Sequence, residues 1–153
     1  MTRLLSRSGA LVQSIVDHLR PFDRRRAPNL KTAKEIGAYG ERVAESFLRR
    51  QKGMRLVCRN FKIQKIGELD LVFLQGKTLV FVEVKTRAPS SLLRASDAVD
   101  QSKRKHLLRA SRAFIREFFA HQKLYYRYDI MEIYLEEGRI PECSWVQDIN
   151  IFR

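Results

Sequence analysis

The stretch GELDLVFLQGKTLVFVEVKTR, residues 67–87, contains two apolar runs on either side of a glycine-containing turn. Short runs rich in Val, Leu and Phe around such a turn predict the two strands of a β-hairpin. Valines at alternate positions from 80 to 84 would line one face of the second strand, and Leu79 and Phe81 the other. We therefore expect the second strand to be buried on both faces, as the central strands of an α/β sheet are.

Asp70 interrupts the first of these apolar runs, and Glu83 and Lys85 stand at the end of the second. If the turn has two residues, 75–76, Glu83 becomes the diagonal neighbour of Asp70 on the same face. If the loop has four residues, 75–78, Glu83 lies directly opposite Asp70. Both registers predict that the two carboxylates converge. Lys85 follows Glu83 by two residues and therefore shares its face.

Burying these charges without partners would be costly, and a divalent cation would remove the conflict. Two carboxylates, the main-chain carbonyl of Val84 and water molecules match the oxygen ligands that Mg²⁺ or Mn²⁺ prefers. Lys85 would not bind the ion; it would orient or deprotonate a water, or neutralise a phosphate. The alternative is a salt bridge on a solvated strand face, which is what most Glu-x-Lys triplets form.

An amphipathic helix is predicted at 33–53, ahead of the hairpin, and Gly53 is expected to close it. Gly37 and Gly40 inside this helix each cost about 1 kcal/mol relative to alanine. Close approach of the helix backbone to a sheet or to a ligand is the compensation that we expect. Glu41 lies beside this glycine face.

Further elements follow the same patterns. Strands are predicted at 54–63 and 124–135, and a basic helix at 101–119; a turn at 136–139 leads to a closing segment at 143–152. This order predicts an α/β fold in which helices cover a mixed sheet. The chain divides near residue 33, so we predict a single domain at 34–153.

The residue pattern of the N-terminal segment, residues 1–33, predicts a helix followed by a basic linker. Its broken apolar pattern and the absence of a small-residue cleavage site argue against a signal peptide. A helix that docks loosely or is disordered is favoured over an arm for a membrane surface or for nucleic acid.

The composition points to a polyanionic partner. Thirty Lys and Arg against seventeen Asp and Glu give a formal charge of +13. Such an excess indicates nucleic acid more often than an anionic membrane surface, although it also serves solubility alone. No apolar run approaches the roughly 18 residues that span a bilayer. The two cysteines, Cys58 and Cys143, fit neither zinc spacing nor a disulfide framework, so we expect a reducing cytoplasm.

The predicted basic helix has two stripes. Its apolar stripe is predicted to face the core and comprises Leu107, Leu108, Ser111, Phe114, Ile115 and Phe118. A second stripe at helical spacing either contacts phosphates or simply solvates the helix; it comprises Lys105, Arg109, Arg112 and Arg116. The tyrosines that follow, Tyr125, Tyr126 and Tyr128, could stack on bases, but their strand spacing favours positions in the core or on a sheet face.

Together these residues resemble a known family. Asp70 followed by Glu83-Val84-Lys85 on the next strand, with Glu41 on the preceding helix, resembles the PD-(D/E)XK nuclease superfamily and its Holliday-junction-resolvase-like branch. The narrower resemblance is to the bacterial YraN family of predicted endonucleases, and it covers residues 35–153. It rests on GAYGERVAESFL, NFKIQKIGELDLV, LVFVEVKTR, Lys103, YRYDIMEI and the terminal NIF.

The resemblance implies a restriction-endonuclease-like three-layer fold and a metal-dependent endonuclease. It assigns metal binding to Asp70 and Glu83, catalysis to Lys85, and a further metal ligand to Glu41. Lys103 matches a family lysine without an assigned role. Leu69 precedes Asp70, at a position where many members of the superfamily carry proline. The resolvase-like branch often lacks that proline.

Several alternatives stay open. A non-catalytic nucleic-acid-binding module would keep the fold and lose hydrolysis. A third alternative, an adaptor that binds a membrane surface through residues 1–20, is less favoured than either of these functions. Metal-free splicing-endonuclease chemistry is disfavoured because His18, His106 and His121 fall away from the acids. DNA is favoured over RNA as partner, with branched and linear forms both open, and the oligomeric state is open, a homodimer included.

Overall fold

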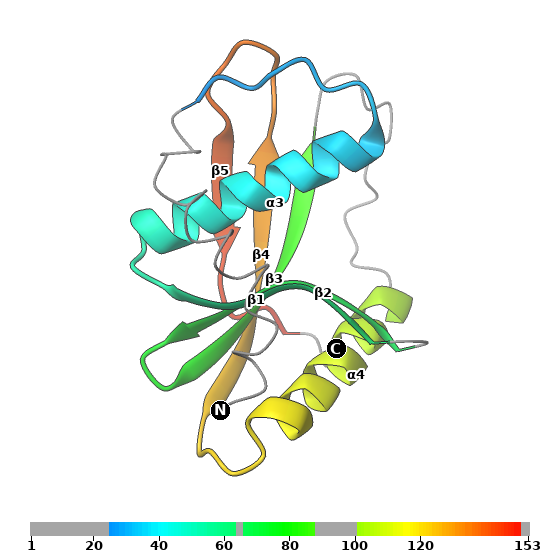
Figure 1. Cartoon of the computed structure of the whole chain (residues 1–153), viewed down its shortest axis with the longest axis vertical. Coiled ribbons are helices and arrows are strands. Elements are labelled where there is room, and N and C mark those ends of the chain that lie inside the picture. Colours follow the sequence, from blue (N-terminus) through cyan, green and yellow to red (C-terminus); the bar gives the residue numbers. More distant parts are fainter. Residues whose placement is uncertain (1–24, 64–65, 88–100, 151–153) are drawn as a thin grey trace, which may run out of the picture.

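The computed structural model describes residues 25–63, 66–87 and 101–150. Its sheet has five strands in the order β1-β2-β3-β4-β5; β3 and β4 run parallel, and the other neighbours are antiparallel (Figure 1). The elements in chain order are α3 (Ala33–Arg50), β1 (Arg55–Ile63), β2 (Gly67–Gln75), β3 (Thr78–Arg87), α4 (Gln101–Phe118), β4 (Tyr125–Tyr134) and β5 (Glu142–Val146).

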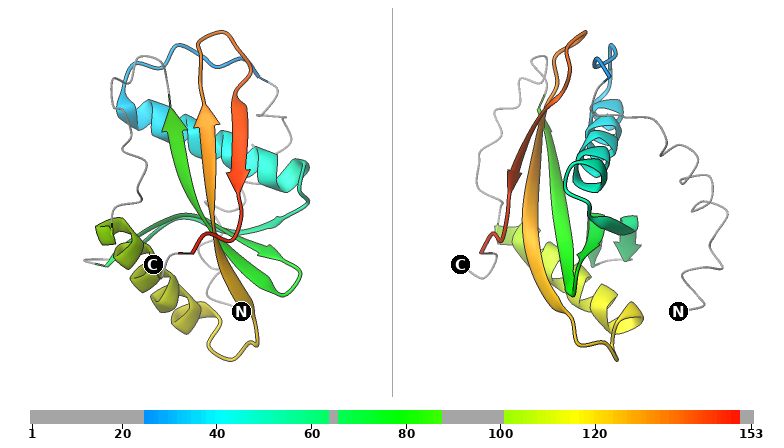
Figure 2. Two further views of the ribbon diagram at one scale, coloured as in Figure 1. Left: turned by 180° about the vertical axis from the view of Figure 1, so that it is seen from behind. Right: turned by 90° about the vertical axis from the view of Figure 1, so that its left-hand side faces the viewer.

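The two helices cover opposite faces of the sheet, which is clear when it is seen from behind and from its side (Figure 2). This arrangement confirms the predicted α/β class with a mixed sheet between helices, and it is compatible with a restriction-endonuclease-like fold. Each helix and strand predicted within the described residues is present, with ends within a few residues of the expected ones. The predicted helix before residue 25 lies outside the described residues.

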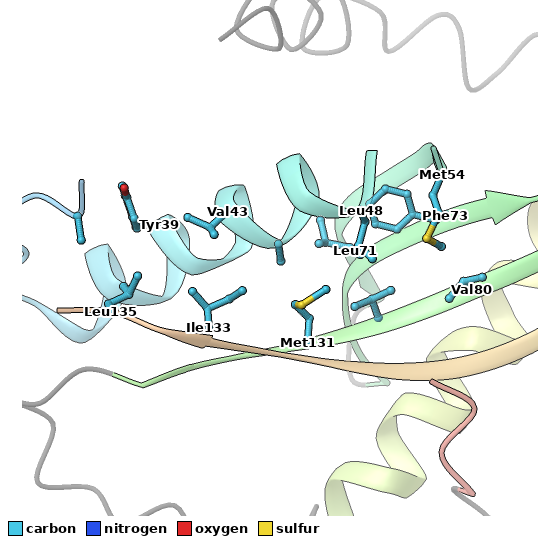
Figure 3. Packing of buried hydrophobic residues seen from close by; sticks show 13 residues of the cluster. Tyr39, Val43, Leu48, Met54, Leu71, Phe73, Val80, Met131, Ile133 and Leu135 are labelled. Carbon is cyan, nitrogen blue, oxygen red and sulfur yellow. The ribbon is translucent and has the colours of Figure 1, made fainter. Parts of the chain in front are cut away.

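Helix α3 begins with a capping box, in which the Thr32 side chain accepts from the Glu35 N–H and Glu35 accepts from the Thr32 N–H. Its apolar face packs on the sheet (Figure 3). The buried cluster under α3 comprises Ala27, Tyr39, Val43, Ala44, Leu48, Met54, Leu71, Phe73, Val80, Val82, Met131, Ile133 and Leu135. Ala27 forms a parallel bridge with Glu137, so residues ahead of α3 also pack against the domain.

The two helix glycines have different surroundings. A Cβ atom added to Gly40 would collide with Thr86 of β3, lying 2.8 Å from the Thr86 Cβ. Gly40 therefore allows α3 to approach the sheet closely, as predicted. At Gly37 such an atom would meet nothing within 4 Å among the residues that the structure describes, so approach to the sheet was the wrong explanation there. Approach of a ligand stays a prediction for Gly37.

Helix α4 packs on the other face through an aromatic cluster. Phe114 of α4 meets Phe61 of β1 edge to face, with ring centroids 5.0 Å apart. Tyr128 stacks on Phe81 at 5.5 Å, and its hydroxyl lies 2.6 Å from the Ser111 Oγ. The predicted apolar stripe of α4 does face the sheet, and Tyr128 is the core residue that its strand spacing favoured.

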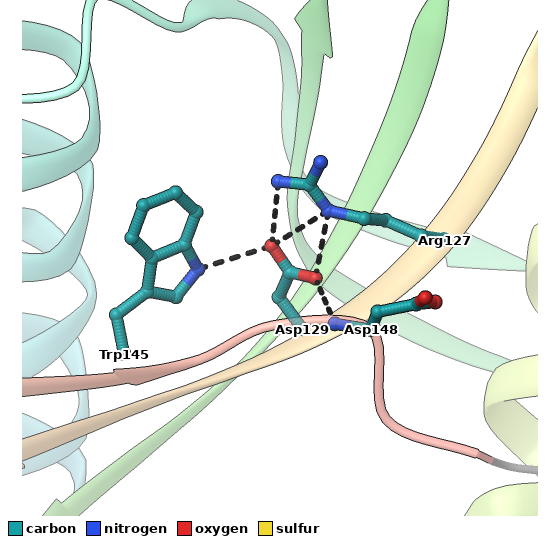
Figure 4. A network of polar contacts seen from close by, with 4 residues as sticks. All are labelled: Arg127, Asp129, Trp145 and Asp148. Carbon is teal, nitrogen blue, oxygen red and sulfur yellow. Dashed lines mark hydrogen bonds and ion pairs between the residues drawn. The ribbon is translucent and has the colours of Figure 1, made fainter.

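A buried polar network joins β4 to the end of β5 (Figure 4). The Asp129 carboxylate is fully buried and accepts hydrogen bonds from Arg127 Nε at 3.0 Å, from Trp145 Nε1 at 3.0 Å and from the Asp148 N–H at 2.9 Å. With these three partners the charge is compensated inside the protein. Asp129 therefore fixes the turn after β5 onto β4, a role that the sequence did not reveal.

Among the described helices, none is both long and apolar enough to cross a membrane.

Candidate functional site

The hairpin turn lies one residue later than the first of the two predicted alternatives, the two-residue turn at 75–76. Strands β2 and β3 pair from Gln75 with Thr78 to Leu71 with Val82, which leaves residues 76–77 as the turn. Gly76 has a φ of 59°, in the left-handed region that glycine enters without strain, and this places the turn at Gly76. The resulting register equals that of the predicted four-residue alternative.

Beyond Leu71 and Val82 the two strands no longer pair with each other, although each keeps the partner on its other edge. The next part of β2 is paired with β1, for example Leu69 with Phe61. The next part of β3 is paired with β4, for example Glu83 with Ile130. The sheet therefore opens between residues 67–70 of β2 and residues 83–87 of β3, an opening that we call the fork; β2 curves away from β3 here (Figure 1).

Asp70 and Glu83 are the first residues on the two arms of the fork. The Val84 N–H donates a hydrogen bond of 2.8 Å to the Asp70 Oδ2 and so links the arms at their base. Both carboxyl groups are largely buried. The structure thus brings together the two acids that the hairpin register predicted to converge.

Their electrostatics are those of crowded, poorly solvated acids. Burial, and then the charge of Glu83, raise the pKa of Asp70 to about 7, against the opposing hydrogen bond from Val84. Burial also raises the pKa of Glu83, and the positive charges of Lys103 and Lys85 oppose it. Asp70 and Glu83 take part in none of the salt bridges formed between described residues. A cation placed between them would relieve both effects.

Two helix residues reach the fork from opposite faces of the sheet. Glu41 of α3 is near enough for its charge to raise the pKa of Asp70, and Lys103 of α4 is near enough to lower that of Glu83. Every sequence-predicted acid and Lys85 therefore lie within electrostatic reach of one point.

Glu68 is an acid of the fork that sequence reasoning missed. Its charge raises the pKa of both Asp70 and Glu83, and its side chain forms a salt bridge of 3.4 Å with Lys62 of β1. The available signal was its spacing of two residues from Asp70, which places both side chains on one side of a strand.

The donor set for an ion is limited. Within the described ranges, no three His, Cys, Asp or Glu side chains gather as a metal-ligand cluster. Glu41 thus acts on Asp70 from a distance and completes no three-carboxylate set. An ion in the fork would rest on Asp70, Glu83, the Val84 carbonyl and water, a hard-oxygen set that fits Mg²⁺ or Mn²⁺.

The predicted nucleic-acid-binding residues of α4 lie in two places. Lys103 precedes the buried Leu107 by four residues and so points toward the sheet and the fork. The other four are exposed on the opposite side of the helix, and we call them the basic stripe: Lys105, Arg109, Arg112 and Arg116.

Polar contacts between β3 and β4 lie at the end of the β3 arm of the fork. Arg87 of β3 donates to the Glu132 Oε1 at 2.9 Å, and the Tyr134 hydroxyl donates to the Glu132 Oε2 at 3.1 Å. Glu132 is also the strand partner of Lys85. The acid beside Lys85 was not predicted, because the register between β3 and β4 depends on the parallel crossover through α4.

Comparison with known proteins gives one consistent result. Residues 40–133 match the family described as "Uncharacterised protein family UPF0102". A UPF0102 protein of Caldicellulosiruptor saccharolyticus is 37% identical over 120 residues, which are 78% of this chain and 95% of the relative. Relatives of the same description occur in Vibrio campbellii, 34% identical over 78% of this chain and 94% of the relative, and in Pseudomonas syringae pv. syringae, 37% identical over 76% and 93%.

Proposed function

The chain belongs to the UPF0102 family, the YraN-like family that its motifs resembled, and from the geometry of its fork we propose that it is a metal-dependent endonuclease. It would hydrolyse phosphodiester bonds in nucleic acid, with DNA favoured over RNA. The observation that carries the proposal is the partly buried pair Asp70 and Glu83, which lies where two strands part and which Lys85 and Lys103 flank. Such perturbed acids in an open part of a fold favour a functional site over a structural one.

Each residue of the fork has a separate task in this proposal. Asp70, Glu83 and the Val84 carbonyl would hold Mg²⁺ or Mn²⁺. When bound, such an ion polarises a phosphodiester and lowers the pKa of water. Lys85 would orient the attacking water and offset the negative charge that grows on the phosphate in the transition state. Lys103, which is placed beside Glu83 and on the exposed surface, would position the cleaved strand.

Glu41 has a supporting role in the proposal. Its charge helps to raise the pKa of Asp70, so it favours either a proton or a cation on that carboxylate. Binding of a cation by Asp70 would make the ionised form the stable one at neutral pH.

A second candidate function is a binding module that keeps the fold without hydrolysis. The observation that favours it is the absence, within the described residues, of a three-carboxylate cluster. The basic surface alone would then supply the affinity, and affinity of that kind falls steeply with salt.

The experiment that separates the two candidates is incubation of the purified protein with branched and linear DNA and RNA, in Mg²⁺, Mn²⁺ or EDTA. The endonuclease predicts cleavage of at least one substrate with an ion and none in EDTA. The binding module predicts salt-sensitive binding and no cleavage with any ion. Size-exclusion chromatography with light scattering on the same preparation gives the oligomeric state, including the homodimer.

A further inference from the structure

A half-exposed tyrosine lies at the start of β4, the strand that follows α4 in the chain. Tyr126, the second residue of β4, is 49% exposed. Its ring contacts that of Tyr128 edge to face, with centroids 6.1 Å apart. Tyr128 is itself held by its contact with the Ser111 Oγ and by stacking on Phe81. The core therefore fixes one side of the Tyr126 ring, while about half of the residue stays in solvent.

The positive charge of the basic stripe also acts on Tyr128, the residue that Tyr126 contacts. Arg112 lies close enough to Tyr128 for its charge to oppose the rise in the pKa of that phenol. Arg112 forms a row with Arg109 and Arg116, at helical spacing on the exposed side of α4. The end of α4 leads through a short loop into β4, so the last turn of α4, which contains Arg116, and the start of β4 lie at the same end of the molecule (Figure 1).

We propose that this surface, formed by Arg109, Arg112, Arg116 and Tyr126, binds single-stranded nucleic acid. The arginines would hold successive phosphates, and an unpaired base would stack on the Tyr126 ring. Stacking on a fixed tyrosine requires a base that is free of its own neighbours, which single strands offer and an intact duplex does not. The charge of +13 supplies the complementarity for a polyanion.

This inference rests on the proposed function only in taking nucleic acid as the partner. The three arginines of this surface lie on the outer side of α4 and Tyr126 lies at the start of β4, whereas Lys103 points from α4 toward the fork. Binding at Tyr126 is therefore separable from hydrolysis at Asp70 and Glu83. A protein that binds single strands there and cleaves nothing would keep this inference and end the endonuclease proposal.

The structure provides a matched control for Tyr126. Tyr125 is more exposed, at 75%, but neighbouring side chains on a strand point to opposite faces, so it faces away from α4. Both residues can be changed to alanine with a similar loss of aromatic surface.

The test is fluorescence anisotropy in EDTA, where no ion supports cleavage, with a labelled oligothymidylate and a duplex of equal length. Tyr126→Ala should weaken binding of the single strand about tenfold and binding of the duplex less than about twofold, since one stacked base is lost. Tyr126→Phe keeps the ring and should bind like the parent. Tyr125→Ala should also bind like the parent.

Changing Arg109, Arg112 and Arg116 together to Gln should lower affinity for both ligands and reduce the slope of log affinity against log salt by about two for the single strand. Equal affinity of Tyr126→Ala and the parent for the single strand would overturn the proposal. So would an equal loss in Tyr125→Ala, or an equal loss for the duplex. Melting curves of each variant show whether a loss of binding follows from unfolding; if Tyr126→Ala unfolds, the Tyr126→Ser variant and an unchanged Tyr126→Phe decide the outcome by the same criteria.

Discussion

The main-chain N–H of Val84 donates a hydrogen bond of 2.8 Å to the Oδ2 of Asp70, across the point where β2 and β3 part. Val84 directly follows Glu83, so this bond sets the distance between the two acids of the fork. It stabilises the ionised form of Asp70, yet burial and the charge of Glu83 outweigh it and raise the pKa to about 7. The fork therefore holds an acid whose protonation changes near neutral pH.

The raised pKa of Asp70 predicts a particular dependence of stability on pH. The folded protein keeps the Asp70 proton up to about pH 7, whereas the unfolded chain loses it near the ordinary pKa of 3.8. The contribution of this proton to the free energy of unfolding is present below the lower value and is lost as pH rises through the upper one. Asp70→Asn should therefore have a melting temperature that increasingly exceeds that of the parent between about pH 4 and pH 7, in EDTA. A difference that is constant with pH would contradict this prediction.

Divalent ions should stabilise the parent protein, whereas a rise in pH should destabilise it. At about pH 8, millimolar Mg²⁺ or Mn²⁺ should raise the melting temperature, because binding to the folded state adds stability by linkage. Asp70→Asn and Glu83→Gln should lose this gain, because each removes one of two carboxylate ligands. Glu68→Gln is the matched control and should keep it. A parent protein whose melting temperature ignores both ions would argue against an ion site in the fork.

The two glycines of α3 should respond to alanine with opposite signs. Gly40→Ala places a methyl group against Thr86 and should destabilise the fold by roughly 1–3 kcal/mol. Gly37→Ala meets no described atom within 4 Å and should stabilise the helix by about 1 kcal/mol. Urea unfolding of both variants measures the two changes. Destabilisation by Gly37→Ala would reveal packing at that position that the described residues do not contain.

Asp129 should behave unlike Asp70, although both are buried acids. Asp129→Asn leaves Arg127 without its anionic partner and should destabilise the protein by roughly 3 kcal/mol. Glu136→Gln breaks an exposed pair with Arg139 and should change stability by less than about 1 kcal/mol. Urea unfolding again gives both values. A change of less than about 1 kcal/mol for Asp129→Asn would show that its hydrogen bonds to these three partners are dispensable.

Periodicity predicted the helices and strands because each buries a regular face. Alternation in β3 and the apolar stripe of α4 needed only local spacing, and both match the two buried clusters. The convergence of Asp70 and Glu83 was predictable because a hairpin register depends on a short loop. Local spacing left two loops open, because both contain Gly76; the four-residue loop gives the observed register and the two-residue turn at 75–76 does not.

What could not be predicted depends on contacts between segments distant in the chain. Strands β2 and β3 stop pairing with each other beyond Leu71 and Val82, while β2 stays paired with β1 and β3 with β4. The network of Asp129 requires β5 to lie beside β4, which no local pattern specifies. The side of α4 on which Lys103 lies became clear only from the packing of that helix on the sheet.

The most direct measurement for the endonuclease proposal compares Mn²⁺ binding with cleavage in three proteins: the parent, Lys85→Ala and Asp70→Asn. Calorimetric titration gives the binding of Mn²⁺, and single-turnover assays on a substrate that the parent cuts give the rate. Lys85→Ala keeps both carboxylates, so we expect it to bind Mn²⁺ like the parent and to cleave at least about a hundredfold more slowly, because the lysine acts mainly in the transition state.

Asp70→Asn should lose Mn²⁺ binding and cleavage together, since it removes an ion ligand. It also reports any contaminating nuclease, because it is purified in the same way as the parent. We expect Mn²⁺ binding with cleavage for the parent, Mn²⁺ binding with little cleavage for Lys85→Ala, and neither for Asp70→Asn. An Asp70→Asn protein that cuts as fast as the parent would contradict the assignment of the site to the fork.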